Sequence, residues 1–273
     1  MQKLVEKYYR SHNLPHIWCP GCGHGVVTMA LVKAIDKLNL DHDKTIIVSG
    51  IGCSSRASGY LNFDTVHSAH GRALPVATGI KLSDPELNVI VISGDGDATA
   101  IGGNHFIHAA RRNINVTMLL YNNNIYGMTG GQYSPLTPVN CKASTAPFGT
   151  IERSFDICDL AKSAGATFVA RSTAFHTQML TDVIAKAIAH KGFSLVEALT
   201  QCPTSYGRQN KIPRPADMLK AQRDHAVTVE AAKKLSPEQL ADKFIIGVLH
   251  QEEAPEYTEQ YDLVIAKAQK GGK

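Results

Sequence analysis

Short runs of apolar residues alternate along the chain with stretches whose apolar positions recur at helical spacing. Runs without polar alternation, typical of strands buried on both faces, fall at residues 45–49, 88–93, 116–121, 167–170 and 193–199. Helical spacing places Val27, Leu31, Ala34, Ile35 and Leu38 on one face, and further helices are expected over residues 105–112, 156–165 and 173–190. The alternation predicts an α/β fold, a doubly wound and mostly parallel sheet covered by helices on both faces.

The pattern changes after Cys202. Three prolines fall within residues 203–220, and the remainder of the chain is polar with helical character. We therefore expect residues 1–205 to form the main domain. Residues 206–273 are interpreted as a C-terminal arm or extension and not as a second domain with its own core.

Composition narrows the class of protein. Hydrophobic residues make up 44% of the chain and charged residues 19%, enough to bury a core. No stretch approaches the roughly 20 apolar residues of a membrane helix, and the first ten residues carry no apolar signal core. The net charge of +4 includes no block of like charges that would indicate nucleic-acid binding. We expect a cytoplasmic protein whose six cysteines are metal ligands, catalytic groups or core residues rather than disulfides.

Unusual loops follow four of the predicted strands. They read GIGCSS from residue 50, GDGD from residue 94, NNNIYG from residue 122 and TQCP from residue 200. The carboxyl ends of parallel strands share one edge of a sheet, and ligands bind in the crevice there. We therefore expect the four loops to gather around one site.

The chemistry of two of these loops indicates a diphosphate with a metal ion. Glycines allow the backbone to approach an anion closely, but the carboxylate of Asp95 would repel it unless a cation lay between them. Mg²⁺ prefers oxygen ligands and is commonly shared between carboxylates and phosphates. Asn123 and the carbonyl of Ile125 supply further oxygens from the next strand end. Either loop alone could be an ordinary turn; their combination after buried strands favours the site.

The Gly94-Asp95-Gly96 and Asn122-Asn123 pair resembles the motif of thiamine-diphosphate enzymes. Longer strings resemble the β subunits of 2-oxoacid:ferredoxin oxidoreductases, and the 2-oxoglutarate type most closely. They are residues 94–132, WCPGCGHG from residue 18, GIGCSSR from residue 50 and HSAHGRALPVATG from residue 67. The resemblance covers roughly residues 10–210.

This resemblance implies a set of site residues. Asp95, Asn123 and Ile125 would hold Mg²⁺, and His70 and Asp97 would belong to the catalytic centre. The residues implied to bind thiamine diphosphate are Ile51, Gly52, Cys53, Ser54, His70, Gly94, Gly96, Asp97, Asn123, Gly127 and Met128.

The cysteines admit several interpretations. Cys19 and Cys22 form a Cys-x-x-Cys pair, which suits zinc, a redox disulfide or an iron–sulfur cluster. Spacing alone does not select two further ligands from the other four cysteines, although Cys53 and Cys202 both fall at the same expected sheet edge. The family resemblance implies one [4Fe–4S] cluster on Cys19, Cys22, Cys53 and Cys202. Zinc stays open as an alternative, and His24 is interpreted as a helix cap or a group that supports the pair.

The resemblance also implies partners. The family takes the glutamate that activates the aminopyrimidine ring from another domain, so we expect a separate α subunit, in an αβ or (αβ)₂ assembly. The reaction implied is CoA-dependent oxidative decarboxylation of a 2-oxoacid, with electrons passing through the cluster to ferredoxin.

The string from residue 126 to 138 favours 2-oxoglutarate as the substrate, with succinyl-CoA and CO₂ as products. Pyruvate and branched-chain 2-oxoacids stay open, as do two other classes. A non-oxidative thiamine decarboxylase component would have the Gly-Asp-Gly motif without a cluster. A non-catalytic zinc or cluster module would leave that motif unexplained.

Overall fold

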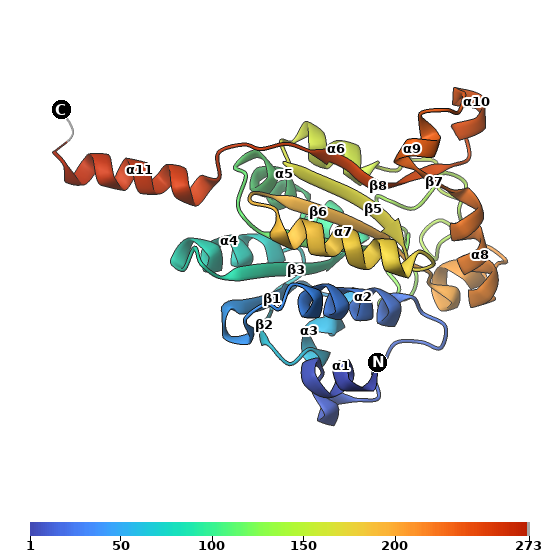
Figure 1. Ribbon diagram of the computed structural model, residues 1–273. Helices are drawn as coiled ribbons and strands as arrows, with labels where there is room; N and C mark the ends of the chain where they lie inside the picture. Colours follow the sequence, from blue (N-terminus) through green and yellow to red (C-terminus); the bar gives the residue numbers. More distant parts are fainter. Residues whose placement is uncertain (272–273) are drawn as a thin grey trace.

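A computed structural model describes residues 1–271, which are built around one eight-stranded sheet (Figure 1). The strand order is β2-β1-β3-β4-β6-β5-β8-β7. The strands span β1 Thr45–Ser49, β2 Asp64–His67, β3 Asn88–Gly94, β4 Thr117–Asn122, β5 Phe168–Thr173, β6 Ser194–Leu199, β7 Ala226–Thr228 and β8 Phe244–Gln251. All neighbours pair in parallel except β8, which runs antiparallel to β5. The predicted mostly parallel sheet is confirmed.

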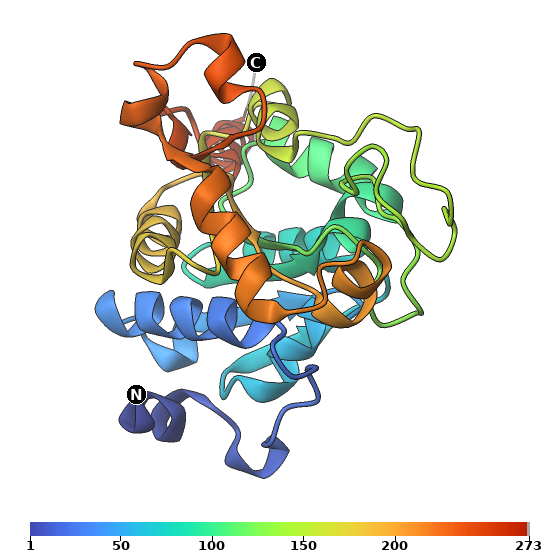
Figure 2. The same cartoon turned by 90° about the vertical axis from the view of Figure 1, so that its right-hand side faces the viewer.

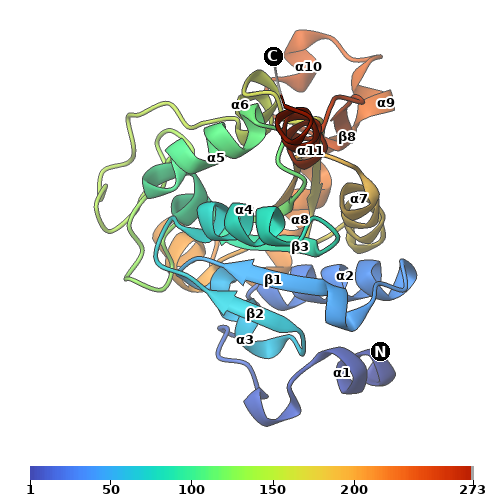
Figure 3. The ribbon, with the colours of Figure 1, turned by 90° about the vertical axis from the view of Figure 1, so that its left-hand side faces the viewer.

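Helices cover both faces of the sheet, as Figure 3 shows. One face packs against α2 (His24–Lys37) and α7 (Thr177–Ala189), with α1 (Gln2–Tyr8) and α3 (Ala57–Tyr60) beyond them. The other packs against α4 (Ala73–Ser83), α5 (Gly103–Arg111) and α6 (Ile157–Ser163). Each face has its own apolar cluster, and β4 is buried along its whole length. The uninterrupted apolar runs therefore mark the central strands of a doubly covered sheet.

The C-terminal segment departs from its predicted helical character. It contains α8 (Pro215–His225), α9 (Val229–Ala232), α10 (Pro237–Leu240) and α11 (Tyr257–Gln269), but also β7 and β8. Because β8 pairs with β5, this segment adds two strands to the main sheet. The division at residue 205 stays a prediction. Figure 1 shows α11 projecting from the body as an arm, and no helix among residues 1–271 is long and apolar enough to cross a membrane.

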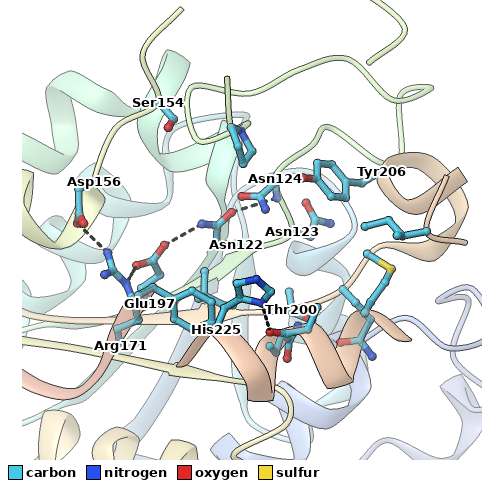
Figure 4. Close-up of a pocket in the computed structure, with 18 of the residues that line it drawn as sticks. Asn122, Asn123, Asn124, Ser154, Asp156, Arg171, Glu197, Thr200, Tyr206 and His225 are labelled. Atoms are coloured by element: carbon cyan, nitrogen blue, oxygen red, sulfur yellow. Dashed lines mark hydrogen bonds and ion pairs between the residues drawn. The ribbon is translucent and has the colours of Figure 1, made fainter. Parts of the chain in front are cut away.

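An ionic network centred on the buried residues Arg171 and Glu197 crosses the sheet and fixes Asn122, the last residue of β4. Arg171 on β5 lies in register with Glu197 on β6, and its Nε donates to the Glu197 carboxylate at 2.5 Å. The Arg171 guanidinium also donates to Asp156 at 2.7 Å, while Asn122 Nδ2 donates to Glu197 at 2.7 Å (Figure 4). Asn122 is thus turned into the network and away from the carboxylate of Asp95.

Replacing Arg171 with methionine is expected to destabilise the fold by about 3–5 kcal/mol, because Glu197 would be left as a buried charge without its partner. Urea unfolding of the variant measures this loss. The double variant Arg171→Met/Glu197→Leu should recover most of it, since both charges are then removed. A loss below about 1 kcal/mol for the single variant would contradict a structural role for the pair.

Candidate functional site

The strand-end loops meet at one edge of the sheet, in front of which α8 crosses (orange in Figure 2). They enclose a pocket of about 210 Å³. Its lining comprises His24, Ile51, Gly52, Cys53, Ser54, His70, Gly94, Asp95, Gly96, Asp97, Tyr121, Asn123, Ile125, Tyr126, Gly127, Met128 and Thr129. All the residues predicted to bind the cofactor and the magnesium ion lie in this lining.

Asp95 is a buried carboxylate beside no cationic side chain. It is 2% exposed and accepts a hydrogen bond from the Ser134 hydroxyl. Burial raises its pKa to about 7, and the hydrogen bonds from Ser134 and from nearby backbone N–H groups offset only part of this shift. A carboxylate in such surroundings is stabilised in its ionised form by a bound cation.

The side chains of Asn122, the last residue of β4, and Asn123 shape the loop opposite Asp95. Asn123 lies in the pocket and is 6% exposed, and its Oδ1 accepts from the backbone N–H of Ile125 at 3.3 Å. Asn122 Oδ1 accepts from the backbone N–H of Asn124 at 3.0 Å, and Asn124 has a positive φ of 61°. These turns place Asp95, Asn123 and Ile125 around one side of the pocket.

Glycines keep space in this pocket at two positions. A β-carbon on Gly96 would lie 2.2 Å from the ring of Tyr126, whose hydroxyl donates to the Gly96 carbonyl at 2.9 Å. A β-carbon on Gly127 would lie 3.5 Å from Cys53 Sγ and 3.7 Å from Cys202 Sγ. Gly96 therefore allows Tyr126 to pack across the Asp95 loop, and Gly127 lies between two of the predicted cluster ligands.

Asp97 holds the surrounding loops together. Its Oδ1 accepts from His70 Nδ1 at 2.6 Å, from the Gly71 N–H at 2.7 Å and from the Ile51 N–H at 3.3 Å, and Oδ2 accepts from the Ser93 hydroxyl. Asp97 is 3% exposed. Because its oxygens are engaged by protein donors, the geometry gives Asp97 a positioning role, and His70 is the member of the pair that is open to the pocket.

We expect Asp97→Asn to weaken thiamine diphosphate binding by roughly tenfold to a hundredfold, the cost of a lost charged hydrogen bond. The amide oxygen can still accept from His70, Gly71 and Ile51 but carries no negative charge, so the hydrogen bonds that anchor these loops are weakened. The amide NH₂ group cannot accept from the Ser93 hydroxyl, so that bond is lost. Fluorescence of Trp18, the chain's one tryptophan, can follow the titration, because its Nε1 donates to the Cys53 carbonyl at 2.7 Å. The exposed Asp64 provides the matched control Asp64→Asn, which should bind normally; equal affinities for all three proteins would contradict the role of Asp97.

The four cysteines predicted to hold a cluster lie together beside the pocket. Burial raises the pKa of the Cys22 thiol to about 12, and the neighbouring sulfurs of Cys202, Cys53 and Cys19 add to the shift. Burial likewise raises the pKa of Cys53 to about 11, with contributions from Cys202 and Cys19. Without metal these thiols are therefore protonated, and metal loading would release their protons.

Contacts between distant segments hold the cysteines in place. The loop that carries Cys19 and Cys22 is joined to the end of β6 by hydrogen bonds from the Gly23 N–H to the Gln201 carbonyl and from Gln201 Nε2 to the Gly21 carbonyl, both 3.1 Å. Gly21 has φ +79° and packs so closely on Pro215 that a β-carbon there would lie 2.1 Å from the proline ring. The C-terminal segment thereby supports the cysteine loop.

The cysteine arrangement differs from a mononuclear metal site. All six cysteines are free of disulfides, Cys141 faces the Tyr206 hydroxyl at 3.1 Å, and Cys158 is buried against Glu197. Within residues 1–271, no three His, Cys, Asp or Glu side chains converge as ligands of one metal ion. A tetrahedral zinc site needs its sulfurs about 2.3 Å from a common centre, whereas a cluster spreads them further apart.

A larger cleft of about 680 Å³ lies behind the Asn123 loop (Figure 4). It is lined by the Arg171 network together with Tyr206 and residues of α8, including His225. It shares Asn123 with the smaller pocket, and Thr200 and Gln201 of the fourth strand-end loop also line it. None of the four clustered cysteines and neither of the loops that begin at residues 50 and 94 lines it, so those two glycine-rich loops belong to the smaller pocket.

Sequence reasoning missed several residues that shape the site. Ser134 and Ser93 bond to Asp95 and Asp97, but a serine in a loop or at a strand end gives no signal of its own. Tyr126 lies in the string that carried the resemblance, so the sequence did single out this segment. Nothing in the sequence indicated that its ring packs against Gly96. The only indication of the Arg171 network in the sequence was a charged residue next to an apolar run.

Comparison with known proteins agrees with this geometry. Residues 50–198 match the family described as thiamine pyrophosphate enzyme, C-terminal TPP binding domain. The chain is similar to the solved 2-oxoglutarate:ferredoxin oxidoreductase from Magnetococcus marinus, with a TM-score of 0.85 and 33% identity over 98% of this chain and 91% of that one. That structure has 2-oxoglutarate, coenzyme A and succinyl-CoA bound.

Curated relatives match along most of the chain. It is 50% identical to the 2-oxoglutarate synthase subunit KorB of Methanocaldococcus jannaschii, over 96% of this chain and 97% of the relative. Identity to the subunit of the same name in Archaeoglobus fulgidus is 53%, over 81% and 80%. Subunit beta of 2-oxoacid:ferredoxin oxidoreductase 2 of Aeropyrum pernix is 45% identical, over 68% and 60%. The family predicted from the motifs is thus confirmed: the chain belongs to the β subunits of the thiamine-diphosphate-dependent 2-oxoacid:ferredoxin oxidoreductases, and its relatives include subunits of 2-oxoglutarate synthase.

Proposed function

We propose that this chain carries the thiamine diphosphate, Mg²⁺ and one [4Fe–4S] cluster of an enzyme that converts 2-oxoglutarate and coenzyme A to succinyl-CoA and CO₂, with ferredoxin as electron acceptor. The observation that carries the proposal is the position of Cys53. It lines the cofactor pocket and also lies in the group of four cysteines. An electron acceptor held there would lie directly beside the reacting cofactor.

The residues of the pocket fit a magnesium diphosphate. Asp95 is a buried carboxylate without a cation, and Asn123 and the Ile125 carbonyl add the neutral oxygens that Mg²⁺ accepts as ligands. Gly94, Gly96 and Gly127 line the same pocket, together with Ile51 to Ser54 and Met128. Ile51 and Met128 are 40% and 47% exposed, as expected of apolar side chains that a ligand or partner covers.

The four cysteines fit an iron–sulfur cluster. Cys19, Cys22, Cys53 and Cys202 come from three loops at one sheet edge, and thiolates are the ligands that such clusters require. Zinc is the alternative, and metal analysis separates it from a cluster.

The bound groups and the residues of the chain would have different roles. When bound, thiamine diphosphate stabilises the carbanion left by decarboxylation, and a cluster accepts electrons singly. The chain's own residues orient His70 through Asp97, hold the metal through Asp95, and bury the Cys22 and Cys202 sulfurs.

The site also requires a second subunit. A pocket of about 210 Å³ is smaller than the roughly 300–1,000 Å³ typical of small-molecule sites, which agrees with a site that is completed by another chain. The exposed Phe148 and Ile151 lie in the loop that leads from Ser134 to α6, and this apolar surface suits the α subunit. That subunit would supply the glutamate for the aminopyrimidine ring and complete an αβ or (αβ)₂ assembly.

The choice of 2-oxoglutarate rests on the relatives, since those named above include 2-oxoglutarate synthase subunits. The family resemblance adds that some broad-specificity members have a lysine where this chain has Gly130. The cation for the distal carboxylate of 2-oxoglutarate would therefore come from the α subunit.

The test is anaerobic purification of the chain with its α subunit, followed by metal analysis and turnover. We expect about four irons and four sulfides per β chain, and CoA-dependent ferredoxin reduction with 2-oxoglutarate well above that with pyruvate or 2-oxoisovalerate. Preference for pyruvate would overturn the assignment of 2-oxoglutarate as the substrate. One zinc per chain, or thiamine-dependent CO₂ release without electron transfer, would overturn the oxidoreductase.

A further inference from the structure

His24 occupies a position between the cysteine group and the cofactor pocket. It is the first residue of α2, is 1% exposed, and lies two positions after Cys22. Its ring lines the pocket and stacks on Tyr121, with centroids 5.3 Å apart and planes 28° apart. Trp18 packs against it from another side at 6.0 Å.

The two ring nitrogens of His24 have different surroundings. Nδ1 lies 3.1 Å from Cys22 Sγ, within hydrogen-bond distance, while Nε2 is buried and has no hydrogen-bond partner. Among residues 1–271, no other side chain makes a hydrogen bond to the sulfurs of Cys19, Cys22, Cys53 or Cys202. The only polar partner that fixes this ring is thus a predicted cluster ligand.

The state of Cys22 decides which nitrogen carries the proton. A free thiol can donate to Nδ1, but a thiolate bound to a cluster can only accept. With the cluster in place, Nδ1 must therefore donate its N–H to Cys22, and Nε2 keeps a bare lone pair toward the pocket.

We propose that His24 is a positioning residue that raises the reduction potential of the cluster by donating Nδ1–H to the Cys22 sulfur. This inference rests on the proposed function, since it requires the cluster. A donor to a cluster sulfur stabilises the more negative, reduced state, and hydrogen bonds of this kind are among the factors that set cluster potentials. The His24 ring is buried and its hydrogen bond to Cys22 is partly buried, so solvent screens the interaction less than at the surface.

Three substitutions distinguish the effect of losing the Nδ1–H donor from the effect of losing the packing of the ring. His24→Asn places an amide near the position of Nδ1 and can keep the hydrogen bond to Cys22. His24→Gln places its amide near the position of Nε2 and loses that bond, and His24→Leu loses both nitrogens.

The measurement is the cluster midpoint potential, by anaerobic redox titration followed by EPR of the full chain with its α subunit. We expect His24→Gln and His24→Leu to lower the midpoint potential of the cluster by about 59 mV. At a fixed potential, the ratio of reduced to oxidised cluster would then fall about tenfold. His24→Asn should stay close to wild type. Iron, sulfide and thiamine diphosphate contents are measured for each protein, and the Asn–Gln comparison carries the test if the leucine variant does not load its cluster.

The outcomes separate this inference from the proposed function. A full cluster with equal potentials in all variants overturns the role of His24 alone. An equal shift in the asparagine and leucine variants overturns it too, because loss of packing would then be the cause. A wild-type chain without a cluster overturns both this inference and the proposed function.

Discussion

Cys202→Ser is expected to abolish cluster assembly and to lower ferredoxin reduction by more than about a hundredfold, since loss of a partner that merely orients a ligand already costs about 10–100-fold. Cys202 is 8% exposed at the end of β6, and its sulfur lies beside Gly127 opposite that of Cys53. A serine there cannot supply the thiolate that the cluster requires. Iron and sulfide should fall from about four per chain to below about one.

The other cysteines provide the control. Cys141→Ser should keep full iron and sulfide, because Cys141 contacts Tyr206 and lies outside the group of four. Thermal unfolding of both variants separates loss of the cluster from loss of the fold. If Cys202→Ser retains its cluster while Cys141→Ser loses it, the ligand set is wrong.

The central sheet could be predicted because its strands are buried on both faces. An uninterrupted apolar run such as β4 has no other stable place in a fold of this size. Strand β8 lies between β5 and the short edge strand β7, is half-buried for most of its length, and pairs with β5 across an irregular register. Its sequence, FIIGVLHQ, contains an apolar run, but that run stands in an otherwise polar and helical segment and was not predicted as a strand.

Charges account for the misplaced boundary of β5. The predicted strand stops at residue 170 because Arg171 follows, and the next predicted helix begins at residue 173. In the structure β5 continues to Thr173, since Glu197 lies opposite Arg171 and neutralises it, and α7 begins only at Thr177. A charge in a buried strand is tolerated when its partner is supplied by a neighbouring strand, and that partner lies 26 residues away.

The site was more predictable than the roles within it. Topology alone brings Ile51, Asp95, Asn123 and Cys202 to one sheet edge, so the loops could be assigned to a common site. The role of Asp97 could not be assigned in this way, because it depends on where two carboxylate oxygens point. They point to Ser93, His70 and backbone N–H groups rather than into open space.

Asp95→Asn is expected to weaken binding of magnesium thiamine diphosphate by more than about a hundredfold, while it stabilises the chain that has no cofactor. The binding loss follows because Asp95 is the carboxylate proposed to hold the metal, and losing even a residue that supports a metal ligand costs about 10–100-fold. Ser134→Ala removes only the hydroxyl that donates to Asp95, so it should give a smaller loss. Calorimetric titration of ThDP in the presence of Mg²⁺ measures both.

The gain in stability follows from the pKa of Asp95. Burial raises this pKa from 3.8 to about 7, so without a cation the folded chain favours the protonated carboxyl. The unfolded chain releases that proton near pH 4. Stability of the cofactor-free chain should therefore fall as the pH rises from about 4 to about 7 and level off above that range, by up to about 4 kcal/mol.

In Asp95→Asn this loss of stability with pH should be absent, because the amide does not titrate. Urea unfolding at pH 5 and pH 8 in the absence of cofactor should give similar stabilities at pH 5 and a more stable variant at pH 8. A residue that only supports the fold would weaken stability and binding together. A gain in stability together with a loss of cofactor binding is expected only when the charge of the replaced group serves to bind a ligand. A variant that is less stable than wild type at pH 8 would therefore contradict the assignment of Asp95 to the metal.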